Sequence, residues 1–233
     1  CNMKEIMRIA RKYKLWVVED ACQALGARFS EGFSDGQEGN YYIAGGMAGT
    51  IGDIGTFSHI APKTLGMGGD GGSIVTNNKK LYEKILLLRN HWNITQGVLH
   101  GHQPKQPKKM DWGHNARLDN VHAAGLNVKM KYYRDMLERR EDIAFMYNAG
   151  LLELPVELPL QQKGQIYQEF IIGVKNMWKF KKFMDKKGIE LLIRDTIPNH
   201  ITYKWYFGDL KLPITEKLAK GSVRLPIWPE MKN

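Results

Sequence analysis

The spacing of apolar residues shifts between helical and strand-like periods along the chain, starting with an amphipathic segment. Met3, Ile6 and Ala10 recur at helical spacing, which predicts a helix over residues 4–14. Residues 16–20 form a short apolar run that ends in a carboxylate, which predicts a buried strand. A helix that leads into a buried strand is the unit of a parallel α/β sheet. The opening pattern therefore predicts an α/β domain.

Further strands and helices are predicted in the first two thirds of the chain. Residues 56–58 and 73–76 predict two short strands, and residues 79–90 predict a helix with one apolar face. Apolar residues then keep helical spacing from Leu118 to Tyr147. That run is too long for one ordinary helix, so we expect a bent helix or a pair of helices.

The pattern changes in the last third. Residues 167–174 predict a strand, residues 177–187 a helix and residues 189–193 another strand, followed by a tail punctuated by prolines. We therefore expect a large α/β domain over residues 1–130 and a small α+β domain over residues 131–233.

Two segments lack a period and predict loops. Residues 32–49 are rich in glycine and polar side chains, which indicates a surface loop. Residues 93–110 predict a long loop of the kind that often has a function in a compact domain. His91, His100, His102 and His114 lie in or beside it, but their spacing matches no familiar zinc pattern, so no metal site is expected.

Composition and charge narrow the class of protein. The 233 residues are 43% hydrophobic and 25% charged, which is typical of a soluble globular protein. No stretch approaches the roughly 18 uncharged apolar residues that a membrane helix needs. The net charge of +10 comes from lysines spread over predicted helix faces, with one denser group between Lys105 and Lys109. Without a nucleic-acid-binding motif, this distribution favours a solvated surface over a nucleic-acid partner.

The cysteines and the first residue suggest the compartment and the extent of the chain. Cys1 and Cys22 offer no disulfide framework, which favours a reducing compartment and predicts a cytoplasmic protein. The chain begins at Cys1, and no signal peptide precedes the first helix, which looks like the middle of a fold. We therefore expect a fragment of a longer protein.

The lysine at position 63 is the most informative residue. Lys63 follows the predicted strand at residues 56–58 and is itself followed by the glycine-rich residues 66–72. Asp20 ends another predicted strand. Pyridoxal phosphate needs an amine for its Schiff base and an anion for its pyridine nitrogen, and Lys63 and Asp20 would supply them. The alternatives are a surface lysine in a loop and an aspartate that caps a helix.

The glycine run allows a second interpretation. Residues 66–71 formally fit the G-x-G-x-x-G pattern of dinucleotide sites. The run precedes a predicted strand instead of opening a helix, so the phosphate-binding mechanism of that motif is excluded. We expect these glycines to allow close approach of the backbone around the cofactor.

Several motifs occur in a consistent order along nearly the whole chain. They are Val18-Glu19-Asp20-Ala21-Cys22-Gln23-Ala24, Gly52-Asp53-Ile54-Gly55-Thr56-Phe57-Ser58, Gly69-Asp70-Gly71-Gly72, Leu88-Arg89-Asn90-His91, Gly113-His114-Asn115-Ala116-Arg117-Leu118-Asp119-Asn120 and Arg224-Leu225-Pro226-Ile227-Trp228-Pro229-Glu230-Met231. Together with the Lys63 loop, they resemble the DegT/DnrJ/EryC1/StrS family of sugar aminotransferases, which belongs to the aspartate aminotransferase superfamily.

The resemblance implies a fold. Members of the family have the PLP-dependent transferase fold type I. They also carry a substantial segment before the strand of Asp20 and a final helix after the Pro229 region. We therefore expect part of a large domain with a mainly parallel sheet, followed by a small C-terminal α+β domain, with the N-terminal part and the C-terminal end absent.

The resemblance also implies roles for residues near the cofactor. Lys63 would form the Schiff base and move the proton between substrate and cofactor. Asp20 would pair with the pyridine nitrogen, and Gln23 would lie against the ring or its hydroxyl, unless it is a packing glutamine. Ser58 would donate its hydroxyl to the phosphate.

More distant residues have weaker roles in this resemblance. Asn115 and Arg117 would reach across a dimer interface to the phosphate region of the partner's site, although a capping asparagine and an interface arginine are the alternatives. His200 and Arg194 would contact the sugar nucleotide.

The function implied by the resemblance is transfer of an amino group, from glutamate, to a keto sugar of a nucleotide-diphosphate sugar. The expected assembly is a homodimer with shared active sites, without nucleic acid or membrane. A PLP-dependent sugar dehydratase is the alternative, but such members replace the lysine with histidine, and Lys63 argues against it. The sequence also leaves open a catalytically inactive relative and a basic nucleic-acid-binding protein.

Overall fold

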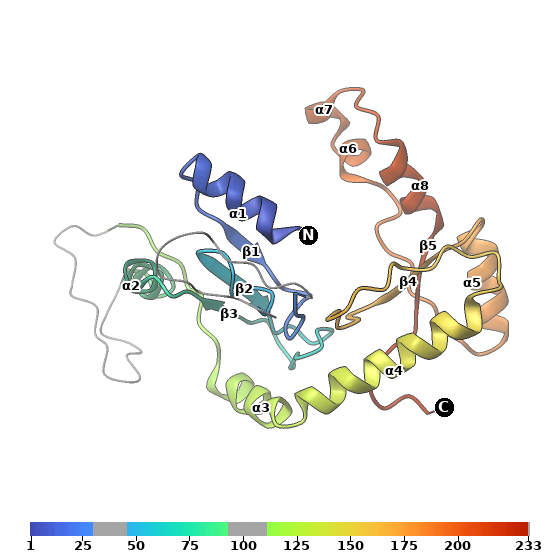
Figure 1. Ribbon diagram of the computed structural model, residues 1–233, viewed down its shortest axis with the longest axis horizontal. Helices are drawn as coiled ribbons and strands as arrows, with labels where there is room; N and C mark the ends of the chain where they lie inside the picture. Colours follow the sequence, from blue (N-terminus) through green and yellow to red (C-terminus); the bar gives the residue numbers. More distant parts are fainter. Residues whose placement is uncertain (30–45, 93–110, 233) are drawn as a thin grey trace. The chain divides into compact units, whose positions relative to one another are not determined.

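The computed structural model of the chain describes residues 1–29, 46–92 and 111–232 (Figure 1). The chain forms two compact units. The first comprises Cys1–Arg134 and Lys163–Ile166, and the second comprises Asp135–Gln162 and Tyr167–Asn233. The boundary between functional domains at residues 130 and 131 stays a prediction.

Two predicted loops fall mainly outside this structure. The loop at residues 93–110, with His100, His102 and its lysines, lies outside the described residues, as does most of the loop at residues 32–49.

A three-stranded sheet forms the centre of the first unit (Figure 1). Strand β1 (Val18–Asp20) pairs in parallel with β2 (Ile54–Ser58), and Asp20 lies opposite Thr56. Strand β3 (Gly72–Val75) pairs antiparallel with β2 on its other side. Parallel strands end at the same edge of a sheet. Asp20 and Ser58, the last residues of β1 and β2, therefore lie at one edge, where the chain enters the loop that carries Lys63.

Helix α1 (Met3–Lys12) confirms the first predicted helix, and its core-facing residues Met3, Met7 and Ala10 are buried. Strand β1 is shorter than predicted. Trp16 is 68% exposed, and the backbone of Val17 hydrogen-bonds to Asp53, just before β2 begins. Hydrogen bonds with Asp53 therefore replace the regular strand pairing that was expected at Val17.

Two further predictions for the first unit are confirmed. Helix α2 (Lys79–Leu88) begins where the Asn78 side chain accepts hydrogen bonds from the amides of Lys80 and Leu81. The long periodic run is a pair of helices, α3 (Asn120–Met130) and α4 (Tyr133–Leu151), with α4 continuing into the second unit.

The second unit contains a two-stranded sheet of β4 (Phe170–Gly173) and β5 (Ser222–Leu225), which pair antiparallel. Its core gathers around Phe170, Ile172 and Val223, whose side chains are almost completely buried. The helices that accompany the sheet are α5 (Met177–Lys186), α6 (Asn199–Thr202), α7 (Lys204–Phe207) and α8 (Pro213–Gly221).

One predicted strand of the second unit is wrong. Residues 189–193 form only a single bridge, between Leu192 and Arg224, and no strand. The sheet partner is β5, inside the tail that the prolines had marked as irregular. Its signal was the alternation of Val223 and Leu225, both buried, with half-buried neighbours.

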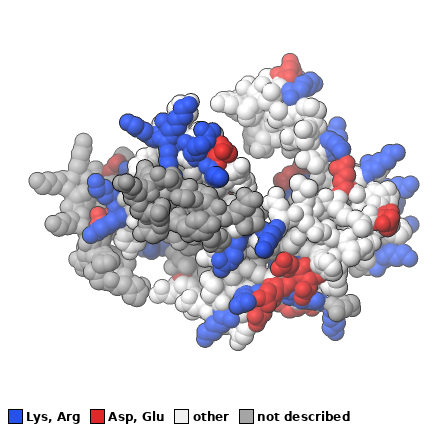
Figure 2. All heavy atoms as spheres, in the orientation of Figure 1, with Lys and Arg blue, Asp and Glu red and all other residues white. Residues whose placement is uncertain are grey.

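Charged side chains are dispersed over the face of the molecule that Figure 2 shows. Among the residues coloured there, Lys and Arg are interrupted by groups of Asp and Glu. That the basic surface is solvated, without a nucleic-acid partner, stays a prediction. No helix within residues 1–29, 46–92 and 111–232 is long and apolar enough to cross a bilayer.

Candidate active site

The candidate site lies at the carboxyl edge of the parallel pair β1–β2. Asp20 ends β1 and is exposed, whereas Ser58 ends β2 and is half-buried. The lysine loop, residues 59–71, continues from β2 and presents Lys63, which is half-buried. The structure thus brings three of the predicted site residues to one edge of the sheet.

The carboxylate of Asp20 is held in its charged form. Hydrogen bonds from the side chain and then from the backbone N–H of Cys22 lower the pKa of Asp20, burial opposes them in part, and the positive charge of Lys63 makes the smallest contribution, which also lowers it. The backbone bond joins Cys22 N to Asp20 Oδ1 over 3.1 Å. Asp20 and Lys63 therefore lie close enough to interact electrostatically.

Cys22 is a neutral partner of this carboxylate. Burial raises the pKa of the Cys22 thiol, and the hydrogen bond to Asp20 raises it further, although a hydrogen bond with Thr56 acts in the opposite direction. The Sγ atom lies 3.9 Å from the carbonyl oxygen of Thr56, the residue opposite Asp20 in the sheet. Cys22 therefore stays a thiol at neutral pH, and its backbone N–H donates to Asp20 and orients the carboxylate.

Glu19 is a residue of this region that sequence reasoning missed. Its carboxylate accepts hydrogen bonds from three backbone amides, those of Gly49 at 2.8 Å and of Ile51 and Gly52 at 2.6 Å each. Successive side chains of a strand point to opposite faces, so Glu19 and Asp20 lie on opposite faces of the sheet. Glu19 fixes the turn before β2, and Asp20 faces the site. The alternation was visible in the sequence, but the amide partners were not.

The lysine loop has a tight turn that requires glycine. The Lys63 amide donates to the carbonyl oxygen of Ile60 at 3.0 Å. A Cβ atom at Gly66 would lie only 2.6 Å from the carbonyl oxygen of Ala61 and 2.9 Å from that of Lys63. That the glycine run admits the cofactor stays a prediction. At Gly66 the requirement comes from the loop itself, which folds back on its own carbonyl groups.

Asn115 and Arg117 lie beside the end of α2. The amides of His114 and Ala116 donate to the carbonyl oxygens of Leu88 and Arg89, and Arg117 Nε donates to Asn115 Oδ1 at 2.9 Å. Both side chains are exposed. Their described contacts are with this segment and with each other, which leaves their role in a partner's site a prediction.

The remaining predicted residues have different surroundings. Gln23 is exposed in the turn after β1. In the second unit, His200 is only 5% exposed, and its Nε2 atom lies 3.2 Å from Glu216 Oε1. The hydrogen bond from His200, followed by that from the Leu212 amide, lowers the pKa of Glu216. His200 is thus already hydrogen-bonded within its own unit, and its contact with a sugar nucleotide stays a prediction.

Arg194 belongs to a surface group of charges. Its Nη1 atom lies 3.6 Å from Glu169 Oε1, and Arg224 Nε donates to the other oxygen of Glu169 at 2.7 Å. The Arg194 side chain is 52% exposed, so it retains room for a further anionic partner. Within the described parts of the chain, no group of three His, Cys, Asp or Glu residues could hold a metal ion.

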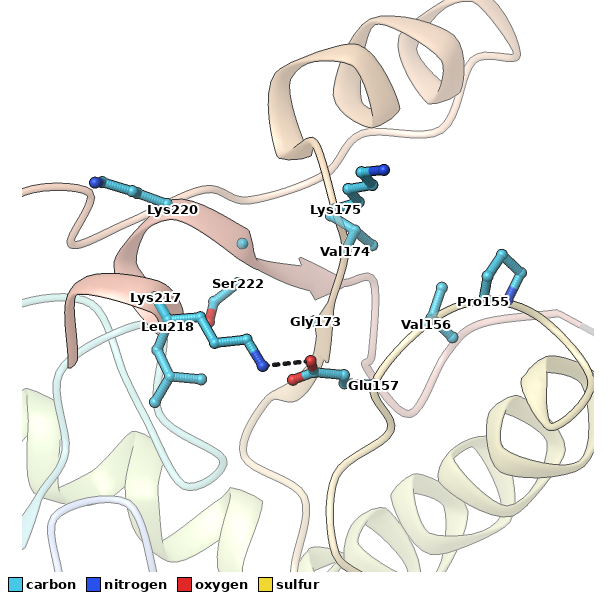
Figure 3. A pocket seen from close by; sticks show the side chains of 11 residues that line it. Pro155, Val156, Glu157, Gly173, Val174, Lys175, Lys217, Leu218, Lys220 and Ser222 are labelled. Carbon is cyan, nitrogen blue, oxygen red and sulfur yellow. Dashed lines mark hydrogen bonds and ion pairs between the residues drawn. The ribbon is translucent and has the colours of Figure 1, made fainter. Parts of the chain in front are cut away.

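A surface groove in the second unit does not coincide with any of these residues. It has a volume of about 560 Å³ and lies between residues 155–157, 173–175 and 217–222. Lys217 Nζ reaches across it to Glu157 Oε1 at 2.6 Å, whereas Lys175 and Lys220 extend away from it (Figure 3). An ion pair between two exposed side chains thus spans the groove, and no predicted site residue lines it.

Known proteins match the chain over its full length. Residues 1–233 match the DegT/DnrJ/EryC1/StrS aminotransferase family. One curated relative is the dTDP-3-amino-3,6-dideoxy-alpha-D-galactopyranose transaminase of Aneurinibacillus thermoaerophilus, 33% identical over 99% of this chain and 58% of its own length. Another is a pleiotropic regulatory protein of Geobacillus stearothermophilus, 30% identical over 99% of this chain and 58% of its own length. The chain therefore spans less than two thirds of these relatives.

Solved structures agree with the sequence matches. DesV of S. venezuelae, in complex with a ketimine intermediate, is 27% identical with a TM-score of 0.80, over 100% of this chain and 58% of that one. NtdA of Bacillus subtilis, with bound cofactor PMP, is 27% identical with a TM-score of 0.75, over 98% of this chain and 49% of that one. The expected fold class, part of a PLP-dependent transferase of fold type I, is confirmed. The chain belongs to the DegT/DnrJ/EryC1/StrS aminotransferase family.

Proposed function

We propose that the intact protein is a PLP-dependent aminotransferase, which transfers an amino group from glutamate to a keto sugar of a nucleotide-diphosphate sugar. The observation that carries the proposal is the group of Asp20, Ser58 and Lys63 at one edge of the sheet, with Lys63 close enough to Asp20 to lower the pKa of its carboxyl group. The names of relatives support the reaction, since they include nucleotide-sugar transaminases.

The residues present fit pyridoxal phosphate. Lys63 provides an amine, Asp20 an anion and Ser58 a hydroxyl, and these are the groups that the aldehyde, the pyridine nitrogen and the phosphate of this cofactor require. When bound, the cofactor supplies an electron-withdrawing ring that stabilises negative charge on the carbon that loses its proton. Gln23, in the turn after β1, would lie against that ring.

Lys63, Asp20 and Ser58 would then have separate roles in the reaction. The Nζ atom of Lys63 would hold the cofactor covalently until the amino donor displaces it, and the freed amine would then accept a proton from the donor and later return one to the sugar carbon. Asp20, kept ionised by Cys22, would hold a proton at the pyridine nitrogen through a charge-assisted hydrogen bond. The Ser58 hydroxyl would donate a hydrogen bond to the phosphate and so help to hold the cofactor.

Amino transfer can be tested directly in the intact protein. Supplied with pyridoxal phosphate, isotopically labelled glutamate and a panel of keto nucleotide sugars, it is expected to move the labelled nitrogen into at least one sugar. Mass spectrometry of the sugar product measures this transfer. Omission of glutamate serves as the control. Loss of water from the sugar without nitrogen transfer would favour the dehydratase instead, and cofactor binding without either reaction would favour an inactive relative.

The intact protein is also proposed to be a cytoplasmic homodimer with shared sites. Cys1 and Cys22 are both free thiols, which suits a reducing compartment. Asn115 and Arg117 are exposed and held as a pair by their mutual hydrogen bond, so their polar groups are available to a second subunit. An arginine is well suited to a phosphate because its guanidinium group can donate two parallel hydrogen bonds.

Mixed dimers distinguish a shared site from a site within one subunit. Full-length Lys63→Ala and Asn115→Ala/Arg117→Ala proteins are each expected to be inactive as homodimers. In the mixed dimer, one site would combine an intact Lys63 with an intact Asn115 and Arg117, so activity should return to about half of the wild-type value per dimer. Heterodimers that form but stay inactive would place Asn115 and Arg117 outside the partner's site.

A further inference from the structure

A buried tyrosine hydroxyl connects the two loops that carry the candidate site residues. Tyr133, the first residue of α4, is 7% exposed. Its hydroxyl lies 2.7 Å from Thr64 Oγ1 and 2.8 Å from the carbonyl oxygen of Leu25. Thr64 directly follows Lys63, and Leu25 lies in the segment that follows Asp20. The Tyr133 side chain therefore hydrogen-bonds both to the residue next to Lys63 and to the segment that follows Asp20.

The direction of these hydrogen bonds follows from the groups involved. A carbonyl oxygen only accepts, so the Tyr133 hydroxyl donates its proton to Leu25. The hydroxyl of Thr64 must then donate to the oxygen of Tyr133. Thr64 is itself only 5% exposed, so water cannot easily replace a lost partner. The bridge is a chain of two hydrogen bonds with one defined direction, of which the Thr64–Tyr133 bond is buried and the Tyr133–Leu25 bond is partly buried.

Helix α3 holds the rest of the lysine loop. His122 Nε2 lies 3.1 Å from the carbonyl oxygen of His59, where the loop begins, and Lys129 Nζ donates to the carbonyl oxygen of Gly66 at 2.6 Å. His122 is 5% exposed and His59 is 6% exposed. These two tethers fix the loop to α3, but neither reaches the segment after Asp20. That connection is made by Tyr133.

We propose that Tyr133 is a positioning residue that sets the separation between Lys63 and Asp20. Its consequence for catalysis rests on the proposed function, but the separation itself is a property of the protein without cofactor. Because the positive charge of Lys63 helps to lower the pKa of Asp20, a larger separation between the two residues raises the pKa of that carboxyl group. Tyr133 therefore acts on the candidate lysine through Thr64 without contacting substrate.

The Tyr133→Phe variant removes one oxygen atom and keeps the ring. In the cofactor-free intact protein, the carboxyl-carbon NMR signal of Asp20, assigned by comparison with Asp20→Asn and followed over a range of pH, reports the pKa of this group. The pKa of Asp20 is expected to rise toward its ordinary value, because the loop that carries Lys63 relaxes away from it. Affinity for pyridoxal phosphate is expected to drop by about five- to tenfold, the order expected for one lost buried hydrogen bond.

The neighbouring Tyr132→Phe variant is the matched control, since Tyr132 is 61% exposed and the substitution makes the same chemical change outside the bridge. The Thr64→Val variant should reproduce the shift in the pKa of Asp20, and adding Tyr133→Phe to it should have little further effect, because both changes break the same chain of bonds. Thr64→Val also decides the question if Tyr133→Phe does not fold.

A pKa of Asp20 in the folded variants that equals the wild-type value, or that is lower, would overturn the positioning role. This outcome is separate from the proposed function. Failure of the intact wild-type protein to transfer an amino group would overturn the function, while the pKa of Asp20 in the cofactor-free protein would still decide the role of Tyr133.

Discussion

Replacement of Lys63 by alanine in the intact protein is expected to lower amino transfer by at least about 10³-fold, because both the covalent attachment and the proton transfer are lost. The cofactor should still bind, more weakly, through the Asp20 carboxylate, which accepts a hydrogen bond, and the Ser58 hydroxyl, which donates one. Turnover of the nucleotide sugar measures the loss. Borohydride reduction of the wild-type holoenzyme followed by peptide mapping should find the cofactor attached at Lys63.

Two variants control this experiment. Lys63→Arg keeps a positive charge near Asp20 but cannot form the covalent link, so it should be as inactive as Lys63→Ala. Lys79→Ala removes a lysine of the same unit that is 88% exposed, and it should leave turnover unchanged. Attachment of the cofactor to another lysine, or near-normal turnover of Lys63→Ala, would remove Lys63 from the proposed mechanism.

Replacement of Asp20 by asparagine is expected to slow amino transfer on the order of 10²–10³-fold, the effect of removing one preorganised electrostatic partner from an active site. The shape of the side chain is preserved, so the fold should survive. The loss should appear in turnover measured at saturating cofactor. An exposed aspartate offers the matched control: Asp209→Asn, 83% exposed in the second unit, should have no effect.

The same variant has two readouts that need no cofactor. The hydrogen bond and charge of Asp20 raise the pKa of the Cys22 thiol, so the pKa of Cys22 should fall in Asp20→Asn, although burial still keeps it high. Because the pKa of Asp20 is lower in the folded protein than its ordinary value of 3.8, this carboxylate stabilises the folded wild type at pH values above 3.8. That contribution is lost as the pH falls through the folded-state pKa, and Asp20→Asn should not show it. Near-normal turnover together with both shifts would leave Asp20 a structural role only.

Residues of the candidate site could be predicted from the sequence where a reactive or polar side chain lies at, or shortly after, the end of a predicted strand. Lys63, Asp20 and Ser58 each follow a short apolar run, and parallel pairing of β1 and β2 brings their ends to one edge. The helix pair α3–α4 was predictable because its period extends over many residues. These features depend on local spacing, which the sequence displays directly.

Contacts between distant residues were not predictable. Tyr133 is 69 residues from Thr64 and 108 from Leu25, and nothing in the local sequence indicates the partners of its hydroxyl. Glu19 reads as a polar interruption of a strand, although it holds a turn about thirty residues away. The strand β5 was missed because four residues give too short a period, and its pairing with β4 crosses a long separation in sequence.

The adjacent carboxylates of β1 also constrain how this strand can pair. Slippage by one residue would exchange Glu19 and Asp20 between the two faces of the sheet. The shorter aspartate would then point toward the amides of the turn at residues 49–52, and the longer glutamate would occupy the candidate site. Val18 is 60% exposed, so burial of apolar side chains does little to select the register. In this strand of three residues, the different lengths of the Glu19 and Asp20 side chains therefore favour the observed register.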